Sequence, residues 1–248
     1  MNTEVILIFL MAGSIIFFSH IIKGATGFAN ALIAIPLLSL LMDIRFVVPM
    51  FLLFDFPSSG MIAWKERKFI QWKEVGTVFI GVFIGTLIGA YLLISLATDI
   101  LKPVFGLVVI GFGLHIATRK NPIEGGRWGR GRGKMLGVIS GFLAGITGGM
   151  FGMDGPIVVL YLSHQLQKAM FRATLVSIFL LGSFWRGSLY IYGGILELEQ
   201  AILALGLVPF LICGVIVGSR FHNHLSQRQF SILIGSILVI AGILLIST

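Results

Sequence analysis

The chain has 248 residues, of which 57% are hydrophobic and only 11% are charged, and its mean hydropathy is +1.02. A soluble domain usually carries about 25% charged residues, so this chain has too few polar groups to cover a water-exposed surface. Its net charge of +8 favours basic loops on the cytoplasmic side of a membrane over a nucleic-acid partner. With Cys213 as the single cysteine, an intrachain disulfide and a cysteine metal cluster are excluded.

Ten apolar segments follow one another along the chain, and most approach the roughly 20 residues that a helix needs to cross a bilayer. They are continuously apolar, which favours helices over the alternating strands of a barrel. The first half contains segments 5–22, 25–42, 46–64, 75–97 and 103–118. The second half contains segments 135–149, 152–166, 173–191, 200–219 and 230–247. Because no basic stretch precedes the first segment, we expect it to belong to the fold and not to be a cleaved signal peptide.

The two halves of the chain resemble each other. Gly24-Ala-Thr-Gly27 before Pro36 corresponds to Gly145-Ile-Thr-Gly148 before Pro156. A shift of 129 residues carries four glycines of the first half onto glycines of the second: Gly85, Gly89, Gly106 and Gly113 onto Gly214, Gly218, Gly235 and Gly242. We therefore predict a first membrane repeat over 1–120, a basic cytoplasmic linker over 121–134 and a second repeat over 135–248, together forming one transmembrane domain.

Basic residues indicate how these repeats are oriented. Of the 18 Lys and Arg residues, 14 fall in four loops, namely Lys65, Arg67, Lys68 and Lys73; Arg119, Lys120, Arg127, Arg130, Arg132 and Lys134; Lys168 and Arg172; and Arg220 and Arg228. The positive-inside rule places these loops in the cytoplasm and both termini outside. The two halves then have opposite orientations, so we predict an all-α membrane protein of two inverted repeats with about 8–10 membrane segments.

Each predicted repeat consists of a helix pair, either glycine-broken or re-entrant, followed by three transmembrane helices. The second pair, 135–166, has about 15 residues in each arm, which is short for a full span and favours a re-entrant hairpin. In inverted-repeat transporters the substrate site lies near the midplane between the repeats.

Two glycine-rich interruptions are the best candidates for a binding site: Lys23–Asn30 and Gly145–Pro156. The N-terminus of a half-helix is electropositive and presents backbone N–H groups, so it suits an anion. The predicted substrate-binding residues are Lys23, Gly24, Thr26, Gly27, Asn30, Thr147, Gly148, Gly149 and Arg186. For isolated pairs such as Gly85 and Gly89, close helix packing is the favoured interpretation.

Charged residues inside the hydrocarbon cost roughly 2.5–3.5 kcal/mol each on insertion scales, which makes each one a functional candidate. Lys23 attracts the anion or extends to an interface. Arg186 either binds the anion through its planar guanidinium or pairs with an acidic side chain. Asp55 lies at a depth similar to that of Arg186, which predicts either a structural salt bridge or a proton-coupled pair.

Three residues are candidates for coupling or gating: Asp55, Asp154 and His20. Asp154 caps the half-helix that begins near Pro156 or takes part in substrate or proton binding. His20 relays protons or makes an ordinary polar contact. No cluster at metal-ligand spacing occurs, and no motif indicates a cofactor.

The runs GATGFANALIAIPLL and GITGGMFGMDGPIVVLYL resemble those of the sulfite exporter TauE/SafE family, within the toluene-sulfonate uptake permease group. The resemblance covers nearly the whole chain, and Asn30 stands where the family commonly has a glycine. It implies transport of sulfur-containing anions, such as sulfite, sulfonates or sulfoacetate, across the bacterial inner membrane.

The leading interpretation is a secondary transporter that moves a small anion by alternating access, with coupling to protons as one option. Anionic lipid headgroups are the expected partners of the basic loops, and the glycine-rich faces permit a homodimer. One alternative is a membrane assembly or adaptor protein that transports nothing. The other is an intramembrane aspartyl enzyme using Asp55 and Asp154, although their surroundings lack the expected motifs.

Overall fold

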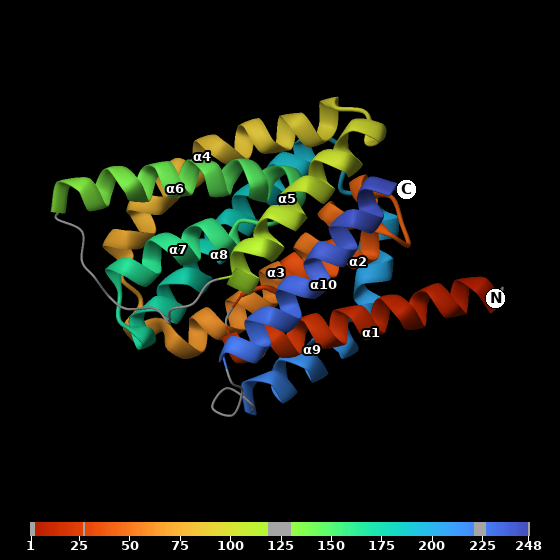
Figure 1. Ribbon diagram of the computed structural model, residues 1–248, viewed down its shortest axis with the longest axis horizontal. Helices are drawn as coiled ribbons and strands as arrows, with labels where there is room; N and C mark the ends of the chain where they lie inside the picture. The colour runs from red at the N-terminus through yellow and green to blue at the C-terminus, as the bar shows by residue number, and fades with distance from the viewer. Residues whose placement is uncertain (1–2, 27, 119–129, 221–226, 248) are drawn as a thin grey trace. The chain divides into compact units, whose positions relative to one another are not determined.

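The computed structural model describes residues 3–26, 28–118, 130–220 and 227–247. The regular structure in these residues is helical throughout, as the continuous apolar runs predict (Figure 1). The linker predicted over 121–134 falls mostly outside the described residues, as do the loop residues Arg119, Lys120 and Arg127.

The helices form two compact units, each built from both halves of the sequence. The first unit contains α1 (Thr3–Thr26), α2 (Asn30–Ser39), α5 (Thr98–Thr118), α9 (Leu198–Arg220), α10 (Gln227–Ser247) and the part of α3 (Ile44–Glu66) that precedes Asp55. The second unit contains the rest of α3, the 3-10 helix η1 (Arg67–Phe69), α4 (Trp72–Ser95), α6 (Arg130–Phe151), α7 (Gly155–Gln165) and α8 (Lys168–Tyr192).

Among the described residues, seven helices are long and apolar enough to cross a membrane. Their outward faces carry large apolar side chains, such as Ile80 on α4 and Leu205 on α9, which are 57% and 73% exposed. In water such surfaces are unfavourable, whereas lipid tails solvate them. The chain is therefore a multi-pass membrane protein.

Two of the predicted membrane segments contain much shorter helices. Segments 25–42 and 152–166 contain α2 and α7, which have 10 and 11 residues. At 1.5 Å per residue these helices extend about 15 Å, roughly half of the hydrocarbon core.

The expectation of a short first arm in the second pair was wrong. Helix α6 has 22 residues, because it begins within the basic segment at Arg130 and continues through all the glycines up to Gly149. Polar residues at the start of α6 concealed this extension from a reading based on apolar runs.

Glycines bring the backbones of α4 and α6 into direct contact, and the two helices lie side by side (Figure 1). A Cβ atom added at Gly81, Gly85 or Gly89 would overlap a carbonyl oxygen of α6. From the other side, a Cβ on Gly145 would lie 2.7 Å from the carbonyl oxygen of Val82, and a Cβ on Gly149 would lie 2.7 Å from that of Thr86. The predicted packing role of Gly85 and Gly89 is confirmed.

The first unit has a crossing of the same kind between α1 and α9. Gly214 contacts the backbone at Phe17, Gly218 contacts Ile21, and a Cβ on Gly24 would lie 2.6 Å from the oxygen of Val215. In both crossings, residues further along one helix contact residues further along the other. Helix α1 therefore runs parallel to α9, and α4 runs parallel to α6.

Helices α5 and α10 cross in the same unit as α1 and α9 but run antiparallel. Gly106 packs on Gly242, and Gly113 packs on Gly235. The shift of 129 residues converts the first of these glycine pairs into the second.

Candidate functional site

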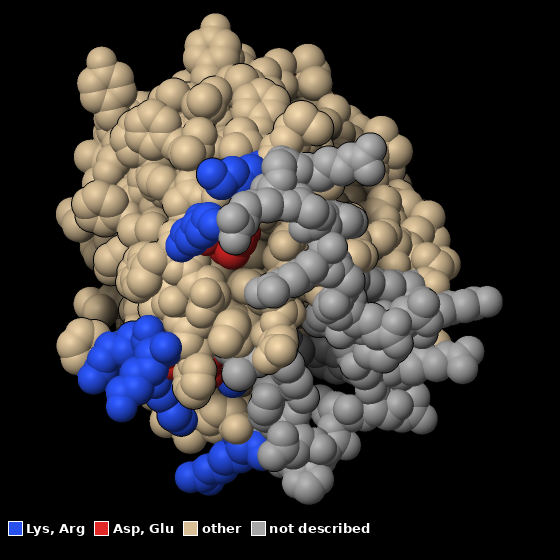
Figure 2. Space-filling view, turned by 90° about the vertical axis from the view of Figure 1, so that its left-hand side faces the viewer, with Lys and Arg blue, Asp and Glu red and all other residues tan. Residues whose placement is uncertain are grey.

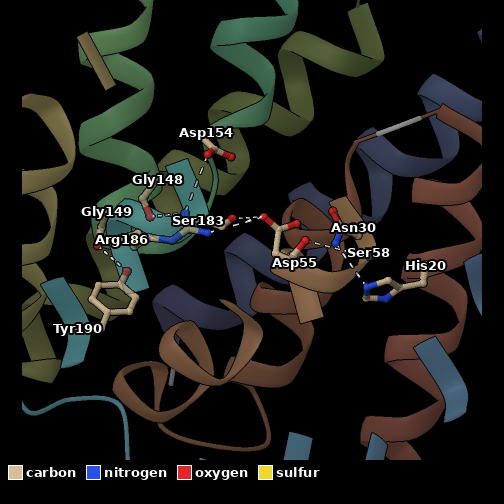
Figure 3. A network of polar contacts seen from close by, with 10 residues as sticks. All are labelled: His20, Asn30, Asp55, Ser58, Gly148, Gly149, Asp154, Ser183, Arg186 and Tyr190. Carbon is tan, nitrogen blue, oxygen red and sulfur yellow. Dashed lines mark hydrogen bonds and ion pairs between the residues drawn. The ribbon is translucent and has the colours of Figure 1, made fainter. Parts of the chain in front are cut away.

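The second unit holds a buried arginine between two carboxylates (Figure 3). Arg186 lies on α8 and is 3% exposed. One terminal nitrogen, Nη1, donates a hydrogen bond of 2.9 Å to the Gly148 carbonyl and lies 4.0 Å from Oδ2 of Asp154. The other, Nη2, lies 3.8 Å from Oδ2 of Asp55, and Nε has no hydrogen-bond partner. The predicted proximity of Asp55 and Arg186 is therefore found as an ion pair.

The two carboxylates are held differently. Asp55 lies within the continuous helix α3, and the Ser183 hydroxyl donates to its Oδ2 at 2.7 Å. Asp154 lies in the loop of three residues between α6 and α7, directly after Met153 and Gly152, and the φ of Gly152 is 71°. It occupies the N-cap position of α7, but its side chain makes no capping hydrogen bond to that helix.

Gly148 leaves the space that the Asp154 side chain occupies. A Cβ on Gly148 would lie 3.0 Å from the Cβ of Asp154 and 3.5 Å from Nη1 of Arg186. A Cβ on Gly182 would lie 3.7 Å from Oδ2 of Asp154, an ordinary contact. One turn after Arg186 on the same helix, the Tyr190 hydroxyl donates a hydrogen bond of 2.7 Å to the Gly149 carbonyl.

These contacts define an ion network of Asp55, Asp154, Ser183, Arg186 and Tyr190. When both carboxylates are ionised, the network carries two negative charges and one positive charge. Charge-assisted hydrogen bonds between arginine and carboxylate are about 2.7–2.9 Å long, so both ion pairs of Arg186 are looser than a direct contact. The guanidinium therefore retains donors for a further acceptor.

The first unit has a separate polar group around the end of α1. His20 is fully buried, and its Nδ1 lies 2.8 Å from the Ile16 carbonyl, which fixes the proton on Nδ1. Its Nε2 faces the amide nitrogen of Asn30 at 3.5 Å (Figure 3). The rings of Phe51 and Phe54 lie about 6 Å from the imidazole, with centroid distances of 6.0 and 6.3 Å. Lys23, one turn further along α1, is also fully buried.

The second glycine-rich interruption is shorter than the sequence suggested. Helix α6 continues to Phe151, so Thr147, Gly148 and Gly149 lie in its last turns and present carbonyl oxygens, with Thr147 bonded to its own helix. Only Gly152–Asp154 separate α6 from α7. Gly24 and Gly149 lie at helix crossings. Gly27 and the side chain of Thr26 fall outside the described residues.

Sequence reasoning missed Ser183, Tyr190 and Gly182. Ser183 and Tyr190 precede and follow Arg186 by three and four residues, so all three side chains share one face of α8. That spacing was available in the sequence. The contact with Gly182 depends on the path of the loop before α7 and carries no comparable signal.

A buried, incompletely paired cation in a multi-pass helical protein is a candidate binding site for an anion. The model of the sulfite exporter TauE/SafE family matches residues 12–245, and the chain belongs to this family. A probable sulfite/organosulfonate exporter TauE from Cupriavidus necator is 27% identical over 180 residues, covering 68% of each chain. No solved structure matches.

Membership of this family confirms the predicted class. Proteins of the family are membrane exporters of anions of the sulfite and sulfonate type and are not enzymes. The interpretation of Asp55 and Asp154 as an aspartyl dyad is set aside, because both carboxylates face Arg186.

Proposed function

We propose that this protein exports a small sulfur-containing anion across the bacterial inner membrane by alternating access, and that Arg186 binds the anion. The incomplete pairing of Arg186 is the observation that carries the proposal. Its carboxylate partners lie 3.8 and 4.0 Å away, and its Nε has no partner although the residue is 3% exposed. A buried donor without an acceptor is costly, and a bound oxyanion supplies the acceptor.

The chemistry of the ligand matches that of the guanidinium. Sulfite and sulfonates present three oxygens around one sulfur, and arginine binds such groups through two parallel N–H donors. The hydrogen bond from Nη1 of Arg186 to the Gly148 carbonyl orients the plane of the guanidinium. Inside a bilayer this interaction is screened less by water than at a surface.

Helix directions support the proposed topology of inverted repeats with both termini outside. Parallel α4 and α6 both begin after basic loops, whereas parallel α1 and α9 both begin where the sequence has no basic loop. The reciprocal contacts of α5 and α10 fit a duplicated chain. This arrangement underlies alternating access in many secondary transporters.

Basic residues at one end of the second unit fit a cytoplasmic membrane surface. Trp64, Phe69 and Trp72 are 72%, 51% and 64% exposed, and the guanidinium of Arg67 stacks over the Trp64 ring at 4.7 Å. Figure 2 shows Lys and Arg side chains gathered on one face, with few acidic side chains among them. Aromatic and basic side chains together favour binding to anionic lipid headgroups.

Flux measured in proteoliposomes tests the proposal. Vesicles loaded with sulfite, taurine or sulfoacetate are diluted into anion-free buffer, and efflux is followed with and without a proton gradient and a membrane potential. We expect efflux of at least one of these anions, accelerated when the loaded side is negative. Absence of efflux for every anion under every gradient would contradict the proposed function.

A further inference from the structure

We propose that the two aspartates beside Arg186 have different roles: Asp154 takes up a proton and yields its place at Arg186 to the anion, while Asp55 remains ionised and anchors the guanidinium. This inference rests on the proposed function and assigns the carboxylate at which anion binding is linked to a proton.

Charge balance favours the uptake of a proton when the anion binds. Asp55 and Asp154 already exceed the single charge of Arg186, so an added anion would bring three negative charges around one buried cation. Like charges at this range in a poorly solvated site repel strongly, and protonation of one carboxylate relieves the repulsion. Binding of a monovalent anion together with one proton leaves the net charge of the network unchanged.

The contacts of Asp55 identify it as the anchor. Its Oδ2 accepts a hydrogen bond of 2.7 Å from the Ser183 hydroxyl and faces Nη2 of Arg186. Both interactions favour the ionised carboxylate. The Ser58 hydroxyl donates to the Asp55 carbonyl at 3.1 Å within the same helical turn. Asp55 lies in the middle of α3, so its carboxylate cannot withdraw from Arg186 without a rearrangement of the helix or of its own rotamer.

Asp154 lies where a carboxylate can move. It follows Gly152, whose φ of 71° is accessible to glycine without strain, and its side chain is not committed to capping α7. Its side chain is 13% exposed, against 7% for Asp55. Its Oδ2 lies 4.0 Å from Nη1 of Arg186, so displacement of the Asp154 carboxylate breaks no short hydrogen bond to Arg186.

The other titratable groups near Asp154 do not compete for this role. Arg186 and Tyr190 of α8 and Asp55 of α3 are the groups of the network itself. On α4, Glu74 accepts the hydroxyl of Tyr161 from α7 at 2.8 Å and is engaged there. His164 lies at the far end of α7, with its Nδ1 on the Leu160 carbonyl.

Binding of ethanesulfonate to the purified full-length protein, measured by calorimetry between about pH 5 and pH 8, tests the assignment. The sulfonate keeps its charge over this range, whereas sulfite titrates within it. Because binding takes up a proton, we expect the Kd of the unaltered protein to decrease as the pH falls, by at most about tenfold per pH unit for one proton.

Matched variants separate the two carboxylates. Asp154→Asn, which mimics the protonated side chain, is expected to give a Kd that is independent of pH and as low as that of the unaltered protein at the acidic end. Asp154→Glu retains a titratable group and is expected to retain the slope. Asp55→Asn is expected to weaken binding but retain the slope. A slope that persists in Asp154→Asn, or is lost only in Asp55→Asn, would overturn the assignment.

Proton uptake by the unaltered protein provides a second readout that needs no variant. In weakly buffered solution with an indicator dye, saturation with ethanesulfonate is expected to take up about one proton per protein at a pH where Asp154 is ionised. Anion binding without proton uptake at every pH would refute the role of Asp154 while leaving the proposed function intact. Failure of the unaltered protein to bind or transport any anion would refute both.

Discussion

The two helix interruptions share one backbone plan but differ in chemistry. In each unit a helix of more than 20 residues ends, three residues follow, and a helix of 10 or 11 residues begins. The first interruption places His20, whose Nδ1 donates to the Ile16 carbonyl, beside Asn30. The second places Arg186 between two acidic groups. The shared backbone plan therefore provides two different chemical environments. At the second interruption, Arg186 has two loose ion pairs and an Nε without a hydrogen-bond partner.

Replacing Arg186 by Gln should have the largest effect, because it removes the cation and leaves two carboxylates without it. Truncating one partner of a buried charge pair at a binding interface costs about 2–5 kcal/mol, so ethanesulfonate affinity should fall at least about 30-fold. Calorimetry measures the change. Arg172→Gln is the matched control on α8, since its 3.1 Å pair with Glu66 is partly exposed. Affinity that is unchanged in Arg186→Gln would move the site away from the second unit.

Alanine at Gly81 should destabilise the second unit without acting on the ion network. Its Cβ would overlap the Val138 carbonyl of α6, and such overpacking typically costs about 1–3 kcal/mol. Gly76 lies on the same helix with open space around it, so Gly76→Ala should be neutral or stabilising. Thermal unfolding in detergent compares the two variants. Equal unfolding temperatures would argue against the direct backbone contact of α4 and α6.

Gly148→Ala should disturb the network by pushing Asp154 aside. The added Cβ would lie 3.0 Å from the Cβ of Asp154, and we expect anion affinity to change by about tenfold, equivalent to 1.4 kcal/mol. Gly182→Ala adds only an ordinary contact at 3.7 Å and should leave affinity nearly unchanged. The same calorimetric titration measures both, and a larger effect from Gly182→Ala would contradict the placement of Asp154.

His20→Gln should have the smallest effect on the anion. Loss of the buried imidazole should lower the stability of the first unit by about 1 kcal/mol through its hydrogen bonds. The pH dependence of ethanesulfonate binding should remain, because the linked proton is assigned to Asp154. Loss of that dependence with a normal unfolding profile would transfer the proton to His20 and weaken the distinction between the two interruptions.

Much of this arrangement follows from the sequence, and the parts that do not have identifiable causes. Apolar runs predicted the helices, and the constant glycine shift predicted residues that occupy helix crossings, because glycine spacing directly reflects backbone contact. The ends of α6 were not predictable, since packing on α4 keeps Gly145 and Gly149 helical although the sequence there suggests a break. The pairing of Asp55 with Arg186 followed from their similar depth, whereas the Asp154 contact depends on a tertiary loop path.

Crystallography with 2-bromoethanesulfonate tests the central claim most directly, because anomalous scattering locates the bromine independently of the protein atoms. The account predicts a single strong peak in the second unit, with the sulfonate on the guanidinium of Arg186 and the Asp154 carboxylate displaced from it. A peak beside Lys23 and His20, with Arg186 still between Asp55 and Asp154, would contradict the account.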